Sequence, residues 1–134
     1  MSKSSVAAAR DNIEANGIEN IFVARMSSEE FVEAWRNKTP KNRLKGLDWD
    51  TLDFRTLVVD PPRCGLDKDT EKLMAGFERV VYVSCNPETL RANLECMRES
   101  HAIRKFAVFD QFPFTHHIEC GVYLEMRDAG ADVP

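Results

Sequence analysis

The sequence lacks any apolar run close to the roughly 20 residues that a membrane-spanning helix needs. Its first residues, Met1 to Ser5, lack the basic and apolar segments of a signal peptide. We therefore expect neither membrane insertion nor export, and we predict a cytoplasmic protein.

An excess of positive charge is also absent. The 134 residues carry 18 Lys and Arg against 22 Asp and Glu, which leaves a net charge of −4. A surface that binds nucleic acid throughout would be basic, so any RNA contact must come from a local patch. The segment from Arg36 to Lys45 is basic, but charged runs of this kind are more often solvated surface than phosphate sites.

Close cysteine pairs are absent, because the four cysteines are far apart in the chain. Spread thiols without an export signal indicate a reducing compartment rather than a disulfide framework. Metal binding would need these thiols together with the paired histidines, and no close ligand pair of the structural-zinc kind is present. We therefore expect no metal site. The residues in question are Cys64, Cys85, Cys96, Cys120, His116 and His117.

What the sequence does have is an alternation of helix and strand patterns, which predicts an α/β fold. The last two strands have only a loop between them, so they should be antiparallel neighbours in an otherwise mostly parallel sheet. Residues 128–134 should form a disordered tail. The predicted helices cover about 5–15, a segment opened by the capping box Ser27 and Glu30, 67–76 and 87–100, and the predicted strands cover 21–26, 56–60, 80–83, 102–109 and 120–126.

The stretch around Cys85 is the part of the chain where chemistry is most strongly indicated. Val80 to Val83 has the composition of a buried strand, and Asn86 followed by Pro87 is typical of a helix start. Cys85 therefore lies at a helix N-terminus, where free amide N–H groups and the helix dipole favour a thiolate. We interpret it as a candidate nucleophile. An inert buried thiol is the alternative.

Two carboxylates are expected beside this thiol. Asp60 ends the predicted strand 56–60, and Glu119 directly precedes the last strand. The carboxyl ends of parallel strands meet at one edge of a sheet, and an antiparallel last strand begins there, so all three side chains should share one crevice. A thiol facing a carboxylate suits covalent and acid–base catalysis. Each carboxylate also has an interpretation without a catalytic role. Asp60 could cap the Pro-Pro turn, and Glu119 could be a solvated loop residue.

Three segments in this order resemble the RNA uracil-5-methyltransferases. The last, with its paired histidines, is most similar to the bacterial tRNA branch, which modifies the uridine of the T-loop. The similarity covers about Ser2 to Arg127. The segments are Asp60-Pro-Pro-Arg-Cys-Gly-Leu-Asp67, Ser84-Cys-Asn-Pro-Glu-Thr-Leu90 and Phe112-Pro-Phe-Thr-His-His-Ile-Glu-Cys-Gly121.

The resemblance implies a partial Rossmann-like fold, S-adenosylmethionine as the methyl donor and the T-arm of tRNA as partner. It also implies a role for each of the three residues. Cys85 would add to C6 of the uracil ring, Glu119 would accept the C5 proton, and Asp60 would contact the cofactor or the base. The target uridine would have to leave its stack to reach them.

Two neighbouring reactions remain as alternatives. RNA cytosine-5-methyltransferases use a cysteine in each of the two turns, and Cys64 lies near the first. Amino-group methyltransferases usually have an aromatic residue where this chain has Arg63, and they would leave Cys85 without a role. The position of Glu119 after the paired histidines favours uracil.

Methyltransferases of this class bind the cofactor on a glycine-rich turn and an acidic strand end, and this sequence has neither. We therefore expect residues 1–127 to be the C-terminal portion of a catalytic domain whose first two strands are absent. The chain alone could then be a catalytically incomplete fragment that does not bind the methyl donor. Either the strands 21–26 and 56–60 pair directly, or the residues before about Leu47 pack loosely.

Overall fold

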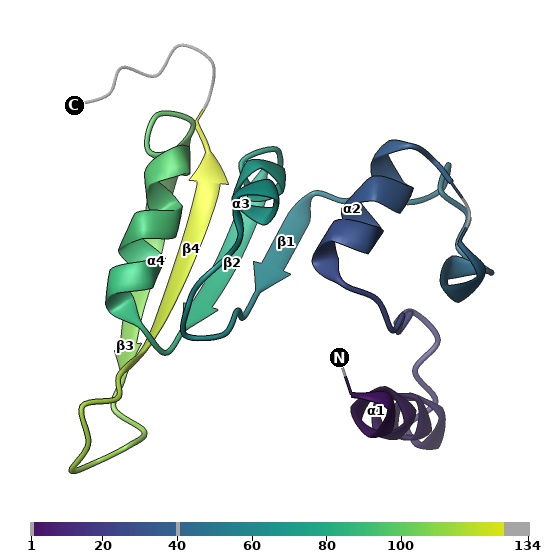
Figure 1. Ribbon diagram of the computed structural model, residues 1–134, viewed down its shortest axis with the longest axis horizontal. Coiled ribbons are helices and arrows are strands. Elements are labelled where there is room, and N and C mark those ends of the chain that lie inside the picture. Colours follow the sequence, from purple (N-terminus) through teal and green to yellow (C-terminus); the bar gives the residue numbers. More distant parts are fainter. Residues whose placement is uncertain (1, 40, 128–134) are drawn as a thin grey trace. The chain divides into compact units, whose positions relative to one another are not determined.

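The computed structural model describes residues 2–39 and 41–127, and the chain divides into two compact units, residues 1–52 and 53–134 (Figure 1). The predicted tail, 128–134, lies outside the described residues. No helix in the described part of the chain is long and apolar enough to cross a membrane.

The first unit contains α1 (Lys3–Ala15), α2 (Ser28–Arg36) and the short 3-10 helix η1 (Asn42–Leu44). The predicted capping box is confirmed, because the Ser27 hydroxyl accepts from the Glu30 N–H and the Glu30 carboxylate accepts from the Ser27 N–H. Met26, Ala34 and Leu44 form a small core, against which the rings of Phe31 and Trp49 pack. This unit therefore has its own apolar centre.

The predicted strand 21–26 is wrong. These residues have no regular secondary structure, and Ile21 and Phe22 are 53% and 46% exposed. An extended segment becomes a strand only when a neighbour pairs with its backbone groups, and the described residues of this unit contain no strand to do so. The segment instead buries Met26 in the small core.

We expect the backbone amides of residues 21–26 to exchange with solvent much faster than those of the strand that contains Val80, which is fully buried. Amides without a ladder partner open with almost no free-energy cost, whereas those of a central strand need a larger opening. Hydrogen exchange followed by mass spectrometry measures this, with the helix-bonded amides of α1 as internal control. Equal protection of the two segments would contradict the assignment.

The basic segment 36–45 is largely neutralised within the same unit. Lys38 pairs with Asp50 at 2.7 Å, Lys41 with Glu33 at 2.7 Å, and Arg43 with Glu30 at 3.1 Å. Carboxylates thus compete with any phosphate for these three cations. The arrangement favours the interpretation of this segment as solvated surface.

The second unit is a four-stranded sheet with two helices. Its elements are β1 (Thr56–Val59), α3 (Lys68–Met74), β2 (Arg79–Ser84), α4 (Pro87–Leu94), the 3-10 helix η2 (Glu95–Met97), β3 (His101–Phe109) and β4 (Glu119–Met126). The predicted helix 87–100 is therefore shorter, since its last part is 3-10 helix and turn. The other predicted elements of this unit are confirmed within a few residues.

The strand order is β1-β2-β4-β3, with β1 and β2 parallel and β4 antiparallel to both of its neighbours. The α/β class and the antiparallel last strand are confirmed. The prediction of a mostly parallel sheet needs correction to a mixed sheet. Although β1, β2 and β3 run in one direction, β4 lies between β2 and β3, so only one of the three adjacent pairs is parallel.

Alternate residues of β2 and β4 form the core of this unit. Val80, Tyr82, Val122 and Leu124 are at most 2% exposed, and α3 and α4 lie over this face of the sheet (Figure 1). Because side chains alternate between faces, the odd-numbered residues of β2 and β4 point to the opposite face, which carries the candidate site.

Candidate active site

The junction between β2 and α4 holds Cys85 in the predicted position. β2 ends at Ser84, Asn86 is the N-cap, and its side-chain oxygen accepts from the Glu88 N–H at 3.1 Å. The buried Ser84 hydroxyl donates to the Asn86 carbonyl at 3.0 Å and accepts from the Asn86 N–H at 3.1 Å. These two hydrogen bonds join the residue before Cys85 to the residue after it, so they fix the turn that carries the thiol.

The register of the sheet brings the three predicted site residues together. Ser84 pairs with Cys120, so one further step along the ladder sets Cys85 opposite Glu119. Val59 pairs with Tyr82, so the same step sets Asp60 beside Val83. Cys85 and Glu119 are odd-numbered, and Asp60 shares the face of its neighbour Val83, so all three side chains point away from α3 and α4.

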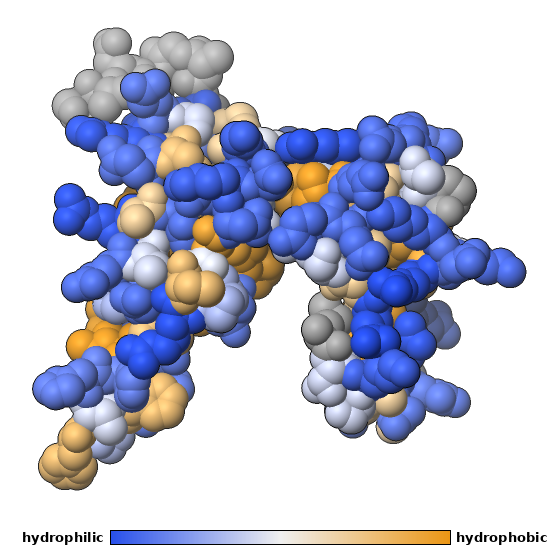
Figure 2. Space-filling model, in the orientation of Figure 1, coloured by the Kyte–Doolittle hydropathy of each residue, from blue (hydrophilic) through white to orange (hydrophobic). Residues whose placement is uncertain are grey.

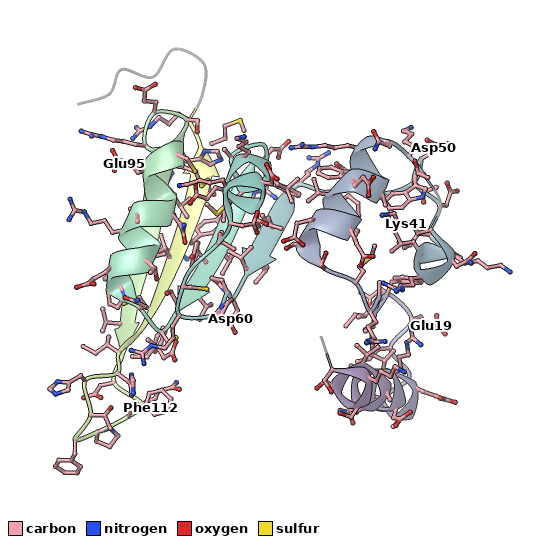
Figure 3. All side chains as sticks on the ribbon, in the orientation of Figure 1. Glu19, Lys41, Asp50, Asp60, Glu95 and Phe112 are labelled. Carbon is pink, nitrogen blue, oxygen red and sulfur yellow. The ribbon has the colours of Figure 1, made fainter. Side chains whose placement is uncertain are left out.

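Asp60, Cys85 and Glu119 line one cavity of about 350 Å³, together with Val83, Phe109 and Gln111. Figure 3 shows Asp60 at the end of the sheet where β1 ends. Cys85 and Glu119 are half-buried, and Cys85 is a free thiol. The volume is at the lower end of the range for small-molecule sites, and the mixture of apolar walls with a few polar groups is typical of them.

The other cysteines do not share this arrangement. Cys64 is exposed and is not among the residues that line the cavity. Cys120 points to the buried face, and burial raises the pKa of its thiol. Desolvation also raises the pKa of Cys96, whose sulfur contacts the Asn93 carbonyl at 3.2 Å. A raised pKa disfavours the thiolate, so neither Cys96 nor Cys120 is suited to nucleophilic attack.

The loop that contains the Asp-Pro-Pro turn is hydrogen-bonded to side chains of α4 and of its N-cap residue. The Asn86 side-chain amide donates to the Arg63 carbonyl at 3.1 Å, and the Thr89 hydroxyl donates to the same oxygen at 3.3 Å. Asn93 accepts from the Leu66 N–H at 2.9 Å and donates to the Leu66 carbonyl at 3.4 Å. The loop that begins at Asp60 and the helix that follows Cys85 therefore form one hydrogen-bonded structure.

Asn93 also connects this loop to the core. Its Oδ1 accepts from the Tyr82 hydroxyl at 2.7 Å, and its Nδ2 donates to the buried Glu71 carboxylate at 2.6 Å. Burial raises the pKa of Tyr82 to about 12, so its hydroxyl keeps the proton that it donates. Lys68 completes the network by pairing with Glu71 at 2.8 Å.

Sequence reasoning missed Asn93. A signal was present, because Asn93 follows Leu90 by three residues and precedes Met97 by four, which places a polar side chain on the buried face of the helix. Such a residue must find partners when it is buried. The sequence alone does not say which.

The described residues contain no group of three or more His, Cys, Asp or Glu arranged to hold a metal ion. His116 and His117 are in the loop between β3 and β4, and His117 contacts the ring of Phe112 edge-on.

Comparisons with known proteins identify the family to which this chain is similar. Residues 1–127 match the tRNA (Uracil-5-)-methyltransferase family. Two curated relatives are the tRNA/tmRNA (uracil-C(5))-methyltransferases of Pseudoalteromonas atlantica and Yersinia enterocolitica. They are each 54% identical, over 127 and 128 residues, 95% and 96% of this chain. The chain spans 35% of the length of each.

A solved structure agrees with these matches. It is the Pyrococcus abyssi tRNA (uracil-54, C5)-methyltransferase in complex with S-adenosyl-L-homocysteine, with a TM-score of 0.61 and 26% identity. The similarity covers 92% of this chain and 26% of that one. With the family match over nearly all of the sequence, the conclusion is that this chain belongs to the tRNA (uracil-5-)-methyltransferase family.

Proposed function

We propose that this chain carries the reacting residues for S-adenosylmethionine-dependent methylation of a uridine at C5 in the T-loop of tRNA. The observation that carries the proposal is the single cavity lined by Asp60, Cys85 and Glu119. The activities stated for the curated relatives support the same reaction.

The first step is assigned to Cys85. C5 of uracil is a weak nucleophile, and addition of the thiolate to C6 converts the ring to an enolate. A new S–C6 bond forms, and the electron pair of the C5=C6 double bond moves toward the C4 carbonyl. The fixed turn around Cys85 holds the sulfur in the cavity, directly before the start of α4.

The second step is assigned to Glu119. S-adenosylmethionine, when bound, would supply its methyl group as an electrophile for the enolate carbon C5, and its sulfur would keep the electron pair of the broken S–CH3 bond. The Glu119 carboxylate then takes the proton from C5, the C5–H electron pair restores the double bond, and the Cys85 thiolate leaves. Its position opposite Cys85 in the register of the sheet suits a base that acts on the atom next to the thioether.

The described residues fit the uracil ring better than they fit the methyl donor. Neither the β1–α3 loop nor the β2–α4 junction is glycine-rich, since Gly65 is their only glycine. Asp60 is the one cavity residue that we assign to binding the methyl donor or the uracil ring. We therefore propose that this chain presents the nucleophile, Cys85, and the general base, Glu119. Most contacts to the methyl donor would lie outside the described residues.

The test is covalent capture. A T-arm RNA with 5-fluorouridine at the target should become attached to Cys85, because fluorine blocks the loss of the C5 substituent that would release the thiol. We expect intact-mass analysis to show the protein–RNA adduct for the wild-type chain and for Cys64→Ala, which removes a cysteine outside the cavity, and none for Cys85→Ala.

The same experiment measures donor use. An adduct that gains one methyl group when S-adenosylmethionine is added would show that this chain completes the transfer. An adduct of unchanged mass would show an incomplete fragment with a competent thiol. An adduct that persists in Cys85→Ala would rule out the assignment of the nucleophile.

A further inference from the structure

The loop between β3 and β4, residues 110–118, carries Phe114 in an unfavourable setting. Its side chain is fully exposed, with a relative exposure of 107%, and its φ is +65°. The left-handed region is costly for residues with a Cβ and is normally filled by Gly, Asn or Asp. A bulky aromatic residue at this position therefore gains no packing and strains the backbone, which indicates a role outside the folding of the chain.

The rest of the loop holds this position in place. Both the N–H and the hydroxyl of Thr115 donate to the Phe112 carbonyl, at 3.2 and 2.7 Å, and the His117 N–H donates to the Thr115 hydroxyl at 3.2 Å. The rings of Phe112 and His117 meet edge to face at 6.1 Å. These contacts close a tight turn with Phe114 directed outward.

The loop is continuous with the candidate active site. Phe109 and Gln111 at its start and Glu119 at its end line the same cavity as Cys85. Figure 1 shows the loop extending past the end of the sheet, and Figure 2 shows hydrophobic side chains among hydrophilic ones at this end of the unit. If a substrate binds in the cavity, the groups next to its reacting part would therefore lie near this loop.

We infer that Phe114 is a stacking residue for a nucleobase next to the uridine that enters the cavity. A uridine that leaves its stack exposes the faces of its neighbours, and unstacked bases in RNA loops are typically held on aromatic side chains. Stacking uses the π-face of the base, so it needs no basic surface and suits a chain with a net charge of −4. The inference rests on the proposed function, because it takes the cavity as the uridine site.

The experiment uses the full chain and a T-arm stem-loop RNA in which 2-aminopurine replaces the base beside the target uridine. Stacking on an aromatic ring quenches this fluorophore. We expect the wild-type chain to quench it and Phe114→Ala to lose the quenching and bind about tenfold more weakly, the size of one lost base–aromatic stack. Phe114→Tyr keeps the ring and should restore both.

Two controls separate stacking from folding. Phe106→Ala removes another exposed phenylalanine. Phe106 pairs with the buried Val122, so its side chain is on the face of the sheet opposite to the cavity, and RNA binding should be unchanged. Phe114→Gly removes the ring and the backbone strain together, so it should bind as weakly as Phe114→Ala without any fall in melting temperature.

Equal affinity and equal quenching for Phe114→Ala and wild type would overturn the inference, as would a wild-type chain that binds the RNA without quenching. Capture of 5-fluorouridine by Cys85 reports on the proposed function separately. A wild-type chain that quenches but forms no adduct would sustain the stacking role and reject the covalent mechanism.

Discussion

Glu119→Gln should slow the release of tritium from a C5-tritiated uridine in T-arm RNA by about 10²- to 10⁴-fold, the usual contribution of a positioned general base. Once Cys85 has added to C6, the C5 position can gain and lose protons, and this exchange needs no methyl donor. The amide of Gln keeps the size of the side chain but cannot accept the proton.

The measurement is the rate at which tritium appears in water, with protein in excess over RNA. Glu125→Gln is the matched control, because Glu125 lies on the same strand but is bonded to Arg104 and Tyr123 away from the cavity. It should exchange at the wild-type rate. Cys85→Ala should abolish exchange. Normal tritium release from Glu119→Gln would assign the proton acceptor to another group.

Asn93→Ala should destabilise the sheet unit by about 3 kcal/mol or more. The substitution leaves the Tyr82 hydroxyl and the Leu66 N–H without a partner and removes one of the two partners of the buried Glu71 carboxylate. An unsatisfied buried polar group costs about 1–3 kcal/mol. Lys68 still pairs with Glu71, so the loss should be smaller than the sum of three such penalties.

The free energy of opening can be read from hydrogen exchange of the β2 amides, which report on this unit alone. Asn12→Ala on the exposed face of α1 serves as control and should leave these amides unchanged. Gly65→Ala should act in the same direction as Asn93→Ala, since a Cβ there would lie 2.4 Å from Asn93 Oδ1 at a φ of +80°. Wild-type exchange in Asn93→Ala would mean that the network adds nothing to stability.

The network also ties stability to the site. Asn93 fastens the loop that follows Asp60, and α4 begins directly after Cys85. We expect Asn93→Ala to reduce capture of 5-fluorouridine RNA even at temperatures where the chain stays folded, because the two turns would no longer be held together. Asn93→Ala with full capture would limit the residue to a structural role.

The strand-to-helix junction at Cys85 was determined by local sequence. A β-branched run, an N-cap at Asn86 and a proline at the first helical position each act within a few residues, so their combined effect can be read directly. The same holds for the capping box at Ser27 and for Asp67, whose side chain caps α3. The meeting of Asp60, Cys85 and Glu119 also followed, because strand direction alone sends all three to one edge.

Only the tertiary structure decided the rest. The segment 21–26 has strand composition, but the described residues of its unit contain no strand to pair with it, and β propensity has little effect without a ladder. The insertion of β4 between β2 and β3, which made the sheet mixed, depends on contacts between distant residues. Asn93 became a junction of loop, core and helix because its side chain makes four hydrogen bonds to three residues, Leu66, Glu71 and Tyr82. Local patterns determine where strands and helices begin, whereas pairing and burial depend on the whole fold, and no short window of sequence contains them.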